Sequence, residues 1–178
     1  MIKLHTLLLA LFLTLSTVAT AKSAKELDHD ANMAINKFIE ENKSADAFLV
    51  KAKAFLVFPD VKEAGFIIGG KYGEGVLRVQ RTTKGYYSMT TASIGMQMGA
   101  QEYSLIIAFT TDEAVNNFLL DSDDWESEVE MKISVAEWNS KEEIDKDYKD
   151  PVVAFVFDSK GLMGSFAMEG TKFKRLKK

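Results

Sequence analysis

The stretch from residue 51 to residue 75 constrains the fold most, because apolar runs, a proline and a cluster of glycines fall within it. The apolar run Ala54–Phe58 favours a β-strand, and Pro59, which has no backbone N–H, predicts that this strand stops there. A second apolar run, Phe66–Ile68, follows a short polar turn. Five of the chain's 11 glycines lie in the next part, between positions 65 and 75, and none precedes them. Since glycine tolerates positive φ and close backbone approach, we expect bends, bulges or a contact surface here.

The first 21 residues have the pattern of a secretory signal peptide. Lys3 provides a positive charge, Leu7–Leu13 is an apolar core, and Ala19–Ala21 is a small-residue cleavage motif ahead of Lys22. The apolar core is shorter than the roughly 20 residues that a membrane-spanning helix needs, which disfavours an uncleaved anchor. The sequence therefore predicts a signal peptide over residues 1–21, a mature domain over residues 22–178, and export to the periplasm or cell envelope.

The composition limits the classes of partner and site. A chain of 178 residues is expected to form one domain. Its net charge of −4 does not suit a nucleic-acid partner, which usually needs a basic domain. There is no cysteine, and His29 is the only histidine after the predicted cleavage site, which excludes thiol nucleophiles, thiolate zinc sites and a multi-histidine metal site. We expect no cofactor and no metal.

Two motifs fall short of a nucleotide or calcium site. Residues 65–72 nearly spell a phosphate-binding loop, but Tyr72 stands where a serine or threonine must bind magnesium, so no nucleotide is expected. Asp121–Asp124 resembles the start of a calcium loop, but Trp125 and Glu126 occupy the third-ligand and glycine positions. The 26 acidic residues leave a carboxylate-dependent hydrolase as a remote alternative.

Three segments are predicted to be helical. Ser23 and Glu26 form a capping box, and apolar residues follow at helical spacing, which predicts an amphipathic helix from about Ser23 to Asn42. This helix either docks on the core or lies on a membrane surface, and its mixed polar face favours docking. A helical turn or two is expected over residues 44–50. A second capping box predicts a helix over Asp112–Leu120.

The remaining pattern is mostly β. The sequence predicts a turn over Thr82–Gly85, a buried strand over Leu105–Phe109 and a strand with one wet face over Val129–Val135. It also predicts a hairpin with its strands at residues 152–157 and 162–168 and its turn at residues 158–161, before a basic end. The expected fold class is therefore α+β, with a single domain. In it, a curved, mostly antiparallel sheet is covered by the N-terminal amphipathic helix and one further helix.

Several separated motifs resemble one known family. They are KAKAFLVFPDVKEAGFIIGGKYGEGVL, GYYSMTTASIGMQMGAQ, TDEAVNNFL, PVVAFVF and KGLMGSFAMEGTK, in that order over residues 51–174. This pattern is similar to the SYLF-domain family, and the chain looks like its stand-alone, exported bacterial type. The resemblance implies a lipid-binding module. Eukaryotic members bind phosphoinositides and in fungi are tied to actin, neither of which an exported bacterial protein ordinarily meets.

The favoured function is non-catalytic binding of anionic phospholipid, a membrane surface or a lipid-like ligand in the cell envelope. Because the whole chain is acidic, attraction to such a surface must come from local basic residues. The alternatives are a structural or protein-interaction module of the envelope, whose protein partner the sequence does not name, and the hydrolase. The candidate lipid-binding residues are Lys51, Lys53, Lys62, Lys71, Lys172, Lys174 and Arg175.

Overall fold

The computed structural model describes residues 21–42, 44–65, 68–94, 99–122, 129–130, 133–136, 150–161, 168 and 170–178. The expected signal peptide up to residue 20, most of the calcium-loop motif, and residues 162–167 of the predicted hairpin lie outside this part. The helices and strands are α2 (Ala24–Glu41), α3 (Ala45–Lys51), β1 (Ala54–Gly65), β2 (Ile68–Val79), β3 (Thr82–Ile94), β4 (Gly99–Phe109), α4 (Asp112–Ser122), β5 (Val129–Glu130), β6 (Ser134–Ala136), β7 (Val152–Gly161) and β8 (Thr171–Leu176).

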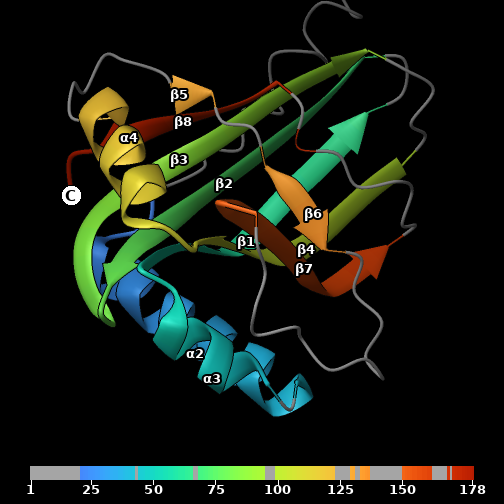
Figure 1. Cartoon of the computed structure of the whole chain (residues 1–178). Coiled ribbons are helices and arrows are strands. Elements are labelled where there is room, and N and C mark those ends of the chain that lie inside the picture. Colours follow the sequence, from blue (N-terminus) through green and yellow to red (C-terminus); the bar gives the residue numbers. More distant parts are fainter. Residues whose placement is uncertain are drawn as a thin grey trace, which may run out of the picture.

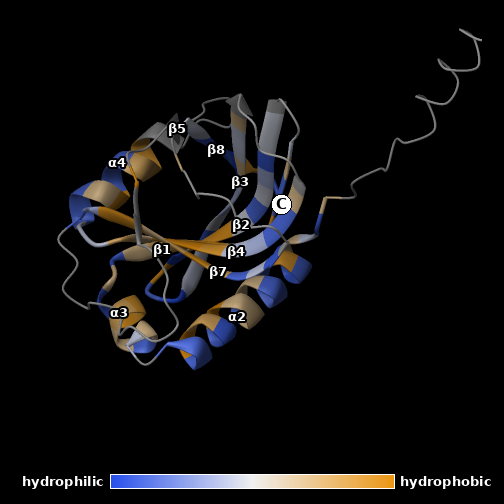
Figure 2. Ribbon diagram, turned by 90° about the vertical axis from the view of Figure 1, so that its right-hand side faces the viewer, coloured by the Kyte–Doolittle hydropathy of each residue, from blue (hydrophilic) through white to orange (hydrophobic). Residues whose placement is uncertain are grey.

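The strands form one sheet in the order β5-β8-β3-β2-β1-β4-β7-β6, antiparallel except for the β6–β7 pair. Helices α2 and α3 lie on one face of the sheet and α4 lies on the other (Figures 1 and 2). The side chains between these layers form two separate buried clusters, one on each face. The predicted α+β class, with a mostly antiparallel sheet and an N-terminal helix, is confirmed.

The sheet is strongly curved. Strands β5 and β6 pair with opposite edges, yet only four chain steps separate Glu130 from Ser134, which limits their Cα atoms to about 15 Å. Seven strand spacings in a flat sheet would place the edges about 34 Å apart. The α4 side is the concave one, because the Phe118 ring reaches both Phe109 on β4 (5.2 Å between ring centroids) and Phe173 on β8 (6.1 Å). The single strand predicted over Val129–Val135 is wrong, since its two ends join opposite edges.

Helix α2 docks on the convex face, as its mixed polar side suggested. The predicted capping box is present, with the Glu26 N–H donating to Ser23 Oγ and the Ser23 N–H donating to the Glu26 carboxylate. Leu27, Ala31 and Phe38 are fully buried against the sheet. The predicted second helix, α4, begins at Asp112, where Thr111 Oγ1 accepts from the Ala114 N–H at 3.2 Å.

The expectation that the first strand stops at Pro59 is wrong. Strand β1 continues to Gly65, and its register shifts between Val57 and Val61 with β2 and between Phe58 and Val61 with β4. The missing N–H of Pro59 therefore falls in a β-bulge, where the ladder is already interrupted. The Pro59 carbonyl accepts a hydrogen bond from Ser104 Oγ at 2.9 Å, which holds the bulge against β4.

Two predicted turns are strand instead. Residues 82–85 begin β3. The chain reverses direction immediately before them, at Gln80 and Arg81, whose φ angles are 49° and 64°. Positive φ at both central residues is typical of a two-residue hairpin turn. Residues 158–161 complete β7, with a bulge at Asp158 (φ 50°) that shifts the register with β4 between Glu102 and Ser104.

The glycine cluster serves close packing rather than positive φ. Gly70, Gly73 and Gly75 all lie within β2, and Gly170 is the one glycine with positive φ among the described residues. A Cβ atom at Gly75 would lie 2.5 Å from Cδ1 of Phe58. The glycine thus makes room for a fully buried aromatic ring of the neighbouring strand.

Candidate functional site

A row of exposed polar side chains crosses the convex face, on the part of the sheet that lies beyond α2. Strand pairing places Lys62 beside Tyr72 and Glu102, Tyr72 beside Thr90, and Thr90 beside Lys172. Glu102 pairs in turn with Lys160 on β7. Adjacent paired residues point to the same face of a sheet, so these side chains form one continuous strip. We name it the lysine row; it consists of Lys62, Tyr72, Thr90, Glu102, Lys160 and Lys172, all of them exposed.

The two bulges put two of these lysines on the convex face. In β1, Ala54, Leu56 and Phe58 face the concave core, so unbroken alternation would send Lys62 there too. The extra residue at the Pro59 bulge reverses the alternation, and Lys62 instead shares a face with Val57. The bulge at Asp158 does the same for Lys160 in β7.

Small residues continue the strip next to the lysine row. Ala64 pairs with Gly70 and with Ala100, and Gly70 pairs with Ala92. The three alanines are exposed and Gly70 is half-buried, so this second row is flat and weakly apolar. Lys174 lies two residues after Lys172 on β8 and points to the same face, so it adds a further exposed cation next to Lys172. This surface carries four lysines and Glu102, and Glu74, which lies in the same cross-strand row as Lys174, is paired with Lys178.

Tyr72 lies at the centre of the lysine row and is 48% exposed. Its hydroxyl group donates a hydrogen bond to Glu74 at 3.0 Å. Burial of the rest of the side chain, followed by this hydrogen bond and the charge of Glu74, raises the pKa of Tyr72 to about 12. The phenol thus stays neutral and offers an aromatic surface with a polar tip, as tyrosines at membrane interfaces do.

The seven residues predicted from the sequence lie in three regions. Lys62, Lys172 and Lys174 are on the convex surface just described. Lys51 and Lys53 are exposed at the opposite end of β1, where Lys53 Nζ is 3.0 Å from the Asp112 carboxylate. Arg175 is half-buried on the other face, because it alternates with Lys174 along β8. The remaining residue, Lys71, is buried.

Lys71 lies on the concave face with Glu63, and its ammonium is 3.6 Å from the Glu63 carboxylate. Burial lowers the pKa of Lys71, while the charge and hydrogen bond of Glu63 act in the opposite direction. Gln101 Nε2 also donates to Glu63 at 2.6 Å. Nearby, burial raises the pKa of the Tyr103 phenol. These side chains form a polar cluster inside the curved sheet and are not available to a surface ligand.

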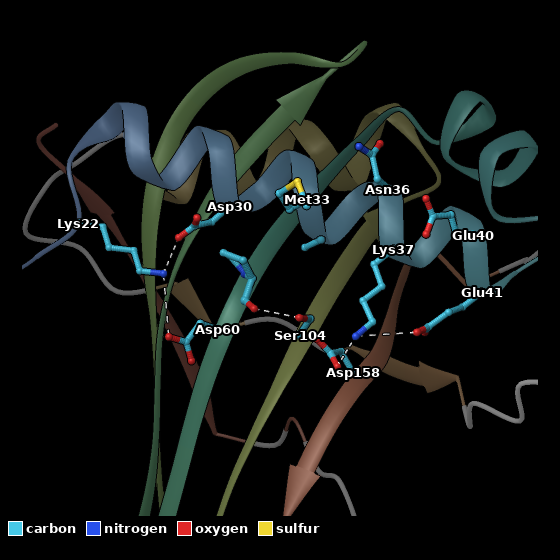
Figure 3. A pocket seen from close by; sticks show the side chains of 12 residues that line it. Lys22, Asp30, Met33, Asn36, Lys37, Glu40, Glu41, Asp60, Ser104 and Asp158 are labelled. Atoms are coloured by element: carbon cyan, nitrogen blue, oxygen red, sulfur yellow. Dashed lines mark hydrogen bonds and ion pairs between the residues drawn. The ribbon is translucent and has the colours of Figure 1, made fainter.

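An acidic groove of about 570 Å³ lies between α2 and the bulged strands (Figure 3). Lys22 reaches Asp30 at 2.7 Å and Asp60 at 4.0 Å across its mouth, and Lys37 pairs with Asp158. Asp60 also lies 3.6 Å from Lys62, so the groove borders the lysine row. Among the described residues, no group of three or more acidic or histidine side chains is placed to hold a metal ion.

Sequence reasoning missed Tyr72, Lys160 and the alanines of the convex surface. The sequence predicts a turn at Lys160. The face of the sheet on which Lys62 lies depends on a bulge that the alternation of residues does not reveal. The turn-like residues Pro59 and Asp158 were signals of irregularity, which the structure resolves as bulges within continuous strands. In the part of the chain that the structure describes, no helix is long and apolar enough to cross a membrane.

Comparison with known protein families identifies the following match. The family model for Ysc84, described as Las17-binding protein actin regulator, matches residues 90–178, which is half of the chain. The matched segment begins within β3 and includes Lys160, Lys172 and Lys174 of the convex surface. No curated protein matches the chain.

Proposed function

This chain belongs to the Ysc84 family of SYLF domains, and we propose that it is a non-catalytic module that binds anionic phospholipid or a similar anionic lipid surface in the cell envelope. The observation that carries this proposal is the exposed convex surface, where four lysines and Tyr72 lie along one side of a flat row of small residues. The family description also names Las17 and actin. We do not extend these partners to a chain whose first 21 residues favour export.

The charge of the convex surface is sufficient for a weak attraction. Each basic residue near an anionic membrane contributes about 1 kcal/mol, so four lysines offset by Glu102 give about 3 kcal/mol. This alone corresponds to binding weaker than about 1 mM. Asp60 lies beside Lys62 and lowers its share, whereas acidic groups farther than about 8 Å are largely screened at physiological salt. Tyr72 and the alanines supply the remaining contact with the lipid interface.

A vesicle sedimentation assay tests the proposal. Mature protein is mixed with vesicles of phosphatidylcholine alone or with added phosphatidylglycerol, over a series of salt concentrations. The triple variant Lys160→Gln, Lys172→Gln, Lys174→Gln is expected to lose binding to the anionic vesicles and to show a flatter salt dependence. Circular dichroism verifies that the variant remains folded.

The matched control is Lys51→Gln, Lys53→Gln, Lys84→Gln, which removes the same charge from the opposite end of the sheet. It should bind like the wild type. If this control loses binding and the triple variant at Lys160, Lys172 and Lys174 does not, the lipid contact lies at the end of the sheet where Lys51 and Lys53 are. A wild-type protein that ignores anionic vesicles would refute lipid binding and leave a protein-interaction module, for which the flat alanine row is also suited.

Two further parts of the proposal concern catalysis and location. The family is a non-catalytic binding domain, and we extend this to the chain; turnover of lipid or glycan substrates by the purified protein would contradict it.

We also propose that residues 1–21 are removed on export to the periplasm or envelope. An intact mass that begins at Lys22 is expected, and a mature form that begins at Met1 would rule this out.

A further inference from the structure

A second cavity, of about 340 Å³, lies on the other side of α2 from the acidic groove. Its apolar walls come from α2, α3 and β1, and two arginines lie at its β2 end. We name it the arginine slot; the residues that matter here are Ile35, Ile39, Leu49, Phe55, Arg78 and Arg81. Sites for small ligands are typically apolar clefts of roughly 300–1,000 Å³ with a few fixed polar groups.

Arg78 is buried and held in place within the slot. Its residue is only 9% exposed. Nη2 lies 3.1 Å from the Asp28 carboxylate and donates to Asn32 Oδ1 at 3.0 Å. Its Nε, by contrast, is buried and has no hydrogen-bond partner among the described residues. The Arg78 side chain lines the slot, so an anionic group bound there would lie beside a buried guanidinium that still has an unmade hydrogen bond.

Arg81 supplies a second cation that can change partners. It lies in the turn between β2 and β3 and pairs with Asp46 at the start of α3. Both side chains of this pair are more than half exposed. Exposed ion pairs contribute little to stability, so a ligand anion can compete with Asp46 for the Arg81 guanidinium at small cost.

We propose that the arginine slot binds one amphiphilic anion, with an unbranched apolar chain and a carboxylate or phosphate head. The chain packs against Ile35, Ile39 and Leu49, and the head receives hydrogen bonds from Arg78 and Arg81. Asn36 of α2 lines both the slot and the acidic groove, but among the described residues no member of the lysine row lines the slot, so the slot is separate from the convex lysine surface. It therefore does not rest on binding to vesicles.

Titration calorimetry with monomeric dodecanoate tests the slot. Wild-type protein is expected to bind one dodecanoate per chain, saturably. The variant Arg81→Gln should bind about tenfold more weakly, because it loses a charged donor. Ile39→Trp should fill the apolar part and abolish binding. Lys25→Gln, an exposed cation elsewhere on α2, is the matched control and should leave dodecanoate binding unchanged.

Head-group and vesicle controls sharpen the result. Dodecanol and dodecyltrimethylammonium, which lack the anion, should bind more weakly than dodecanoate. If Arg81→Gln also weakens binding to phosphatidylglycerol vesicles, the chain in the slot comes from a membrane lipid; if it changes dodecanoate binding alone, the ligand is a free amphiphile. The absence of saturable dodecanoate binding to the wild type, or equal binding by wild type and Arg81→Gln, would overturn the proposal, whatever the vesicle assay of the convex surface shows.

Discussion

The ammonium group of Lys71 lies 3.6 Å from the carboxylate of Glu63, across the neighbouring strands β2 and β1 on the concave face of the sheet. Both side chains are less than a tenth exposed. Nothing in the sequence distinguishes Lys71 from the exposed Lys62, and the sequence predicts lipid contact for both. The structure distinguishes them: Lys62 is an exposed cation, whereas Lys71 belongs to a buried ion pair.

Removing one partner of this pair should be costly. Lys71→Met leaves the Glu63 carboxylate buried without its counter-charge, and we expect the free energy of unfolding to fall by about 3–5 kcal/mol. The double variant Glu63→Gln, Lys71→Met removes both charges and should recover most of that loss. Urea unfolding measures the free energy of unfolding of the single and the double variant. A single variant as stable as the wild type would show that the two groups are not buried together.

The glycines of β2 should differ sharply in their tolerance of a methyl group. At Gly75, a Cβ atom would lie 2.5 Å from Cδ1 of Phe58 and 2.6 Å from the Val57 carbonyl oxygen, so Gly75→Ala should lower stability by about 1–3 kcal/mol. At Gly70, the nearest contact is an ordinary 3.4 Å to the Thr91 carbonyl oxygen. Gly70→Ala is therefore the control, with little expected change in melting temperature. Equal effects at the two positions would contradict the packing role of Gly75.

Tyr72 should make stability depend on pH in the alkaline range. Its pKa in the folded protein is about 12, above the value of about 10 expected for the unfolded chain. Between these values the unfolded state loses the phenol proton while the folded state keeps it. The contribution is thus fully present below pH 10 and is lost as the pH rises through 12. Tyrosinate absorbance should show this late titration together with those of Tyr86 and Tyr103, whose pKa values burial also raises. Tyr72→Phe should remove the share of one phenol, and Glu74→Gln should shift that share to lower pH.

The two ends of the predicted mature chain are joined through Lys178. Its ammonium lies 2.6 Å from the Glu74 carboxylate and also donates to the backbone carbonyl of Lys22, just before α2. Both side chains of the ion pair are about nine-tenths buried. We expect Lys178→Met to lower stability by roughly 1.5–3 kcal/mol, the range for hydrogen bonds to charged groups.

Hydrogen exchange locates this effect. In Lys178→Met, faster exchange is expected at the first turn of α2, because the segment that precedes it has lost its anchor. Lys25→Met, which changes an exposed lysine of the same turn, is the control and should leave the exchange rates near those of the wild type. Unchanged protection in Lys178→Met would mean that the anchor does not hold the helix.

Local signals alone determined much of the secondary structure and the family. The start of α2 follows from a capping box that spans four residues, and its buried face follows from helical spacing. Helix α4 and the apolar strand β4 were likewise predictable, because each depends on contacts within a short stretch of chain. The α+β class and the family resemblance needed nothing beyond the order of these motifs.

Tertiary structure alone decided how the strands pair and which residues share the convex surface. Pro59 and Asp158 resemble strand ends in the sequence, but pairing with β2 and β4 carries β1 past Pro59, and pairing with β4 carries β7 past Asp158, each through a bulge. Each bulge adds one residue, which reverses the face of everything after it and brings Lys62 and Lys160 into one row with Lys172. Likewise, residues 129 and 135 join opposite edges because the sheet is curved. Such long-range pairings depend on partners that are distant in the chain, and no local pattern encodes them.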